Sequence, residues 1–153
     1  MPKIDLESIE QLNRTGYPPP FDQAVAGRWV RRLSPATGMT DFGASHVVLK
    51  PGAWSSQRHW HDGEDEFLVM IAGEATLIED EGRTLLRAGD CAAFPKGTRN
   101  GHHLVNESDS DCVFVVVGGG TNTGGGYSDI DMLFTPDNRY IHKDGTPYDA
   151  QRR

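Results

Sequence analysis

The central part of the chain, from about residue 40 to 118, alternates short apolar and β-branched runs with turn residues. Pairs such as Pro51-Gly52 and Glu81-Gly82 favour turns and end these runs. No long segment with a helical period lies among them. The pattern predicts roughly eight strands at even spacing, which is typical of an antiparallel β-sandwich or barrel. The central strand candidates are ASHVVLK, EFLVMI, EATLIE, RTLLRA, CAAFP, HHLVN and DCVFVVV.

The two ends of the chain differ from this pattern. Residues 1–35 are expected to form an irregular arm, because the prolines of GYPPPF at 16–21 end any short helix and favour an extended segment. Within this arm, GRWVRRL at 27–33 is a candidate for a first strand. Residues 119–153 are expected to start as a flexible glycine-rich link. They should continue as an aromatic tail that packs on the barrel or across a subunit interface.

Length and charge narrow the class of protein. A chain of 153 residues is expected to form one domain. The formal net charge of −7 argues against nucleic acid and anionic membrane as partners, because both attract basic surfaces. The charged start of the chain does not resemble a signal peptide, and the longest apolar stretch, CVFVVVGGG, is too short to span a bilayer. Cys91 and Cys112 are therefore expected to be free thiols in a cytoplasmic protein.

The strongest chemical signal is the pair His59 and His61 in the stretch RHWHDGEDEF. Strands alternate faces with a period of two, so both imidazoles should point to one side, with Gln57 on the same face and Trp60 opposite. Two imidazoles inside a barrel are costly unless they bind something. Neutral imidazole is also the commonest metal ligand among side chains. The stretch therefore predicts a metal site.

A second polar segment lies about forty residues further on, in FPKGTRNGHHLVN. His102 and His103 are neighbours, so on a regular strand they face opposite sides and only one can join an inward site. Arg58, Lys96 and Arg99 lie near the two segments. Charged loop residues are usually solvated, so we do not expect these three to recognise a substrate.

These segments resemble the two conserved motifs of the cupin superfamily. The first motif runs through Gly52, His59, His61, Glu66 and Gly73, and the second through Gly89, Pro95, Gly97, His102 and Asn106. The spacing departs from the family pattern in two slightly longer loops, one before His59 and one between Gly97 and His102. The motifs cover residues 52–106, and the flanking strands extend the likeness to about residues 40–118.

The resemblance implies an all-β jelly-roll barrel, also called a double-stranded β-helix, over residues 36–118, with one divalent metal ion inside. The family's ligands fall on His59, His61, Glu66 and His102. Three imidazoles and one carboxylate suit Fe, Mn, Ni, Co, Cu or Zn, and they suit Mg or Ca poorly. Four protein ligands leave open positions on a six-coordinate ion for a small-molecule substrate. The resemblance also implies a homodimer, in which the apolar tail could pack.

The motif spacing chooses among the acids that follow His61. Glu66 begins the next apolar strand, whereas Asp62, Glu64 and Asp65 are expected in the intervening turn. Glu64 is the alternative ligand if that turn is tighter. Gln57 is either a hydrogen-bond partner for a water or substrate on the metal, or a polar residue at the mouth of the barrel.

Cupins support many chemistries, so three functions stay open. A metal-dependent isomerase acting on a sugar or sugar phosphate is slightly favoured, although the sequence names no general base besides Glu66. A mononuclear Fe(II) dioxygenase would need only metal positions for O₂ and substrate. A small-molecule binding protein without catalysis is the third alternative. No helix-turn-helix pattern is visible, which argues against a DNA-binding regulator.

Overall fold

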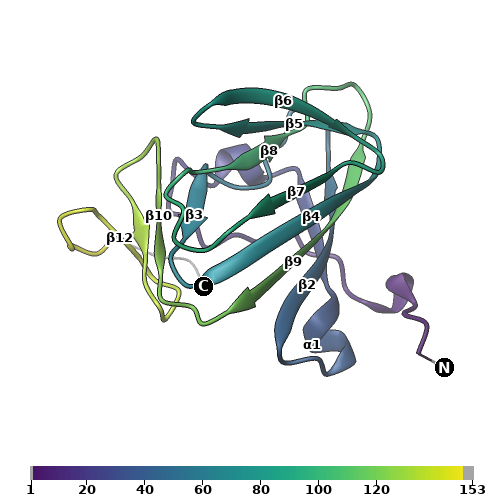
Figure 1. Ribbon diagram of the computed structural model, residues 1–153, viewed down its shortest axis with the longest axis horizontal. Coiled ribbons are helices and arrows are strands. Elements are labelled where there is room, and N and C mark those ends of the chain that lie inside the picture. Colours follow the sequence, from purple (N-terminus) through teal and green to yellow (C-terminus); the bar gives the residue numbers. More distant parts are fainter. Residues whose placement is uncertain (1, 150–153) are drawn as a thin grey trace.

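The computed structural model describes residues 2–149, and strands dominate it (Figure 1). The described strands form three antiparallel sheets with the orders β1-β2-β9-β4-β7, β6-β5-β8 and β12-β11-β10-β3. The strands are β1 (Arg28–Arg32), β2 (Phe42–Leu49), β3 (His59–His61), β4 (Glu64–Ala72), β5 (Glu74–Glu79), β6 (Gly82–Arg87), β7 (Cys91–Phe94), β8 (His103–Val105), β9 (Cys112–Gly120), β10 (Gly125–Tyr127), β11 (Leu133–Phe134) and β12 (Tyr140–Ile141). The helices are the single-turn η1 (Leu6–Ser8) and η2 (Gln23–Val25) and the short α1 (Leu33–Thr37). The all-β prediction is confirmed.

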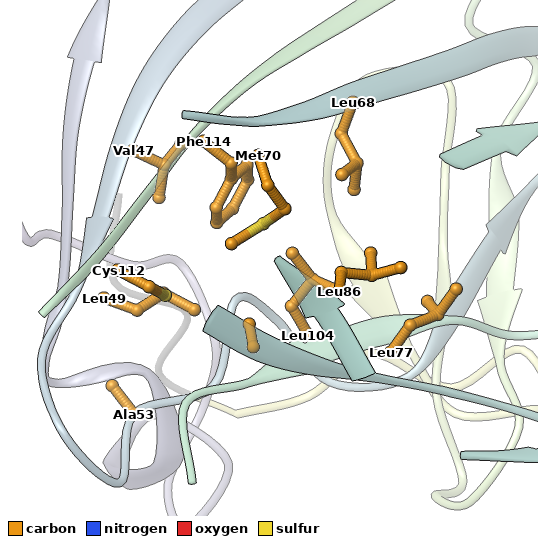
Figure 2. Packing of buried hydrophobic residues seen from close by; sticks show 11 residues of the cluster. Val47, Leu49, Ala53, Leu68, Met70, Leu77, Leu86, Leu104, Cys112 and Phe114 are labelled. Atoms are coloured by element: carbon orange, nitrogen blue, oxygen red, sulfur yellow. The ribbon is translucent and has the colours of Figure 1, made fainter. Parts of the chain in front are cut away.

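The five-stranded and three-stranded sheets are the two layers of a jelly-roll barrel, and the main core fills the space between them. Figure 2 shows Met70 of β4 and Phe114 of β9 pointing from one layer toward Leu86 and Leu104 of the other. Met70 and Leu104 are each only 1% exposed. Alternation along β4 leaves Ile71 on the outer face. The period of two in the sequence therefore builds this core.

The glycine-rich run differs from its prediction as a flexible link. Its first part continues β9, and Gly125 and Gly126 belong to β10, which pairs with β3 (Figure 1). A Cβ atom on Gly125 would collide with the carbonyl of Trp60, and one on Gly126 would collide with the Trp60 ring. These glycines therefore allow two strands to approach closely. Single-sequence reasoning cannot distinguish this use of glycine from flexibility.

The N-terminal and C-terminal segments pack against each other beside β3. Tyr17 and Val25 form a second buried cluster with Tyr127 and Met132. The aromatic tail thus finds packing partners within the chain. β1 lies within the expected N-terminal arm, yet it belongs to the main sheet, because all of its residues pair with β2. The domain boundaries drawn from the sequence stay a prediction.

The helices found in residues 2–149 lack the length and apolarity that a membrane crossing requires. Both cysteines, Cys91 on β7 and Cys112 on β9, are free thiols, as the sequence predicted.

Candidate metal centre

Strands β3 and β4 and the residue before β8 bring four polar side chains together. His59 and His61 come from β3, Glu66 from β4, and His102 is held opposite His59 by a β-bridge. The Nε2 atoms of His59 and His61 are 3.2 Å apart. Nε2 of His102 lies 2.8 Å from Oε1 of Glu66, and Nε2 of His61 lies 3.5 Å from Oε2 of Glu66. The two motifs that are far apart in sequence therefore share one site.

The donor atoms have the spacing that a shared metal ion requires. One ligand atom each from His59, His61 and Glu66 can be chosen so that all lie within 4.8 Å of one another. Ligands at right angles on an ion with bonds of about 2.1 Å would be about 3.0 Å apart. The observed separations of 2.8 to 3.5 Å are close to this value. This group could hold a transition metal ion, and its nitrogen and carboxylate donors suit one.

Neighbouring groups orient the ring of His59. Its Nδ1 lies 3.0 Å from the carbonyl oxygen of Gln57 and 3.1 Å from Oγ of Ser56. Because a carbonyl only accepts hydrogen bonds, Nδ1 of the neutral ring carries the proton, and Nε2 presents a lone pair to His61. Such outer contacts fix the tautomer of metal-binding histidines.

The other two rings are also held in place. His102 stacks on Phe94, with ring centroids 3.5 Å apart and an interplanar angle of 3°. Nδ1 of His61 faces Oε2 of Glu64 at 3.5 Å. This Nδ1 is buried and has no hydrogen-bond partner of normal geometry in the described part of the chain. Glu64 is therefore an outer neighbour of the site, behind the ring whose Nε2 faces inward.

Burial is the largest influence on the charges in this group. It lowers the pKa of His59 to about 4, so the ring is neutral near pH 7. Burial alone would raise the pKa of Glu66, but hydrogen bonds from His102 and His61 outweigh it and hold this pKa well below its ordinary value. Burial also opposes protonation of His61, yet Glu66 and Glu64 outweigh it and raise its pKa. The ionised carboxylate beside these rings attracts a cation.

The contacts of Gln57 and the position of Glu64 differ from what the sequence suggested. Gln57 reaches His59 through its main-chain carbonyl, while its side-chain amide donates to the carbonyl of Phe21. Glu64 was expected in a turn, but β4 begins at this residue, so Glu64 and Glu66 share one face of the strand. The turn before β4 is shorter than expected, because β3 ends at His61 and β4 begins at Glu64.

His103 faces away from the group, as the alternation of a strand requires. Its Nδ1 lies 2.8 Å from the carbonyl oxygen of Ser56, and its ring packs edge-on against Trp54. His102, and not His103, therefore lies beside Glu66, and its role as a metal ligand stays a prediction.

The site forms one wall of a cavity of about 570 Å³ between the sheets. Apolar side chains of Leu68, Phe114 and Val116 line part of the cavity. Tyr17 and Arg28, from the N-terminal part of the chain, also line it. Sequence reasoning did not connect these two residues with the site.

Comparisons with known proteins identify proteins of the same fold. A cupin domain model matches residues 45–118. No curated protein matches this chain in sequence. A sugar phosphate isomerase of the cupin superfamily from Silicibacter pomeroyi has 42% sequence identity over 99% of both chains, with a TM-score of 0.91.

Two further structures share the fold at lower identity. A candidate sugar phosphate isomerase from Acidithiobacillus ferrooxidans has 20% identity over 84% of both chains, with a TM-score of 0.69. The polyketide cyclase RemF from Streptomyces resistomycificus has 18% identity over 78% of this chain and 79% of its own, with a TM-score of 0.61. The likeness to the Silicibacter protein extends over nearly the whole chain, and both motifs meet at one site. The chain therefore belongs to the cupin superfamily.

Proposed function

We propose that the chain is a metal-dependent isomerase that acts on a sugar phosphate. The observation that carries this proposal is the convergence of His59, His61, His102 and Glu66 on one wall of the cavity. In the proposal, His102 is the fourth ligand of one divalent transition ion, which is Fe, Mn, Ni, Co, Cu or Zn. The similar Silicibacter protein, described as a sugar phosphate isomerase, supports the choice of reaction and substrate.

The chemistry fits an isomerisation that needs no oxidant. A bound metal ion would polarise a substrate carbonyl and acidify the neighbouring C–H bond. The apolar lining from Leu68, Phe114 and Val116 limits water around the reacting atoms. Tyr17 also lines the cavity, and its hydroxyl accepts the N–H of Gln57 at 3.3 Å. Burial raises the pKa of Tyr17 to about 12, so the hydroxyl keeps its proton and can donate to a substrate oxygen.

Solvent deuterium provides the test of this reaction. The metal-loaded protein is incubated in D₂O with a panel of aldose and ketose phosphates, and the recovered sugar phosphates are analysed by mass spectrometry. We expect deuterium in the substrate and interconversion of the two sugar forms, without O₂ consumption. The His61→Ala variant, which lacks one donor of the site, serves as the control and should give no label.

Two other results would contradict the isomerase. Consumption of O₂ with added Fe(II), without label in the sugar, would instead support a dioxygenase. Saturable binding of the sugar phosphates that neither exchanges a proton nor converts them would support a binding protein without catalysis.

A homodimer is part of the proposal. Phe67 and Ile71 on the outer face of β4 are 44% and 52% exposed, and Phe42 on β2 is 42% exposed. Exposed apolar side chains on one face of a sheet favour contact with another protein surface. Light scattering should give twice the chain mass of 16.8 kDa, and the Ile71→Glu variant should shift toward a monomer. A monomer mass for the unaltered protein would contradict the dimer.

A cytoplasmic location also remains part of the proposal. The free thiols of Cys91 and Cys112 support it, because reduced cysteines persist in a reducing compartment.

A further inference from the structure

Strand β1 presents two arginines to the cavity. Arg28, Val30 and Arg32 alternate along the strand and line the cavity together. Arg31 lies on the opposite face, where its Nε donates to the carbonyl of Ile9. The inward face of this strand is therefore cationic at both ends.

The guanidinium of Arg28 is anchored, but one of its donors has no partner among the described residues. Nη1 donates to the carbonyl of Ser55 at 2.8 Å, and Nη2 lies 3.5 Å from the carbonyl of Arg14. Nε is buried and makes no hydrogen bond to any of residues 2–149. A buried donor on a charged group is costly to leave unpaired. Arg28 also lines the cavity, where its charge can attract an anion.

Arg58 differs from Arg28, because carboxylates of the same chain neutralise its charge. Its guanidinium is neutralised by Asp80 at 2.6 Å and by Asp129 at 2.9 Å. Arg28 has no comparable carboxylate among its hydrogen-bond partners within residues 2–149, since both partners are main-chain carbonyls. Its positive charge is therefore available to a ligand.

The charged residues that line the cavity also favour an anionic ligand. Arg14, Arg28 and Arg32 line it, and Glu66 is the one acid in that lining within the described part of the chain. This local excess of positive charge occurs in a chain whose net charge is −7. The cavity is thus suited to an anionic ligand.

Two neighbouring residues connect Arg28 to the candidate metal centre. The carbonyl of Ser55 accepts from Arg28, and the hydroxyl of Ser56 contacts Nδ1 of His59 at 3.1 Å. Consecutive Cα atoms are about 3.8 Å apart, so one short loop holds the guanidinium and the imidazole near each other. The cavity of about 570 Å³ has the size of a typical small-molecule pocket.

We propose that Arg28 binds the phosphate group of a phosphomonoester substrate, while Arg14 and Arg32 add positive charge to the lining of the cavity. The other end of the substrate then reaches His59, His61 and Glu66. This inference rests on the proposed function for the rest of the substrate, but its anion site can be measured without turnover. Arg28 offers planar, charged N–H donors, which match the oxygens of a phosphate dianion.

Calorimetric binding of inorganic phosphate to the metal-loaded protein tests this site. The Arg28→Gln variant should weaken phosphate binding by about 10- to 100-fold, because charged hydrogen bonds are lost. Arg28→Lys keeps the charge and should bind more tightly than Arg28→Gln. The matched control is Arg87→Gln, which removes the same charge from an exposed residue on β6 and should leave the Kd within about twofold. Thermal unfolding of each variant verifies that it is folded.

Phosphate could also bind the metal ion, and a second variant separates the two sites. His61→Ala removes a metal donor and should retain phosphate binding, whereas Arg28→Gln should lose it. The opposite pattern would overturn the inference, and so would the absence of saturable phosphate binding to the unaltered protein. Tighter binding of acetate than of phosphate would also contradict it. A failed isomerase assay with intact, Arg28-dependent phosphate binding would count against the proposed function alone.

Discussion

Replacement of His59 by Ala is expected to remove the metal ion from the purified protein and to abolish any metal-dependent activity. His59 supplies a donor 3.2 Å from that of His61, and its Nε2 is kept unprotonated by the carbonyl of Gln57. Changes to groups behind a ligand already cost about 10- to 100-fold in metal affinity, so loss of a ligand should cost more. Elemental analysis should give about one ion per chain before the change and a small fraction of that after it.

Two variants of nearby acids, with different expected losses of metal affinity, make this test sharper. Glu64→Gln weakens only the contact to Nδ1 of His61, so its metal affinity should fall by about tenfold. Asp62→Asn removes the same charge from the same acidic stretch, but Asp62 faces Arg99 at 3.8 Å and should have little effect. Competition with a chelator gives the affinities. Full metal retention by His59→Ala would contradict the site. A loss in Glu64→Gln as large as in His59→Ala would make Glu64 a ligand.

The local part of the site could be predicted because it depends on short-range rules. The period of two places His59 and His61 on one face of β3, and the structure keeps both Nε2 atoms together. The same rule separates His102 from His103. The expectation that Glu64 lies in a turn was wrong, because the turn before β4 is short and strand ends are the least certain part of a sequence-based assignment. That His59, His61, Glu66 and His102 are metal ligands stays a prediction.

The cationic part of the cavity around Arg28 could not be predicted, because it depends on contacts between distant segments. The alternation of RWVRR indicates that Arg28 and Arg32 share a face, but it does not say which face points inward. That choice follows from the pairing of β1 with β2 and from Leu12, which pairs with Val30 at the edge. The contact from Arg28 to Ser55 spans 27 positions in the sequence. Arg58 was nearer to the motifs, yet it is neutralised at the surface.

The last position of the second motif, Asn106, should contribute strongly to stability. Asn106 is fully buried, and its amide nitrogen donates to the carbonyls of Leu49 at 2.9 Å and Ser110 at 2.8 Å. Its side-chain oxygen accepts from the N–H and hydroxyl of Ser108 at 3.0 and 2.7 Å. All of the hydrogen-bonding groups on this amide are therefore engaged, and they tie the end of β2 to the loop before β9.

Asn106→Ala should lower the free energy of unfolding by about 3 kcal/mol, because the change removes the hydrogen bonds of a fully buried amide to Leu49, Ser108 and Ser110. For a domain of this size, that loss corresponds to a fall in Tm of roughly 6 to 12 °C. Asn106→Asp should be at least as harmful, since a carboxylate would face two carbonyl oxygens. Ser108→Ala removes contacts at a more accessible position and should cost less than about 1 kcal/mol. Urea unfolding of the metal-saturated proteins measures these differences. An Asn106→Ala variant of unchanged stability that loses its metal would contradict the structural role and assign this amide to the metal centre.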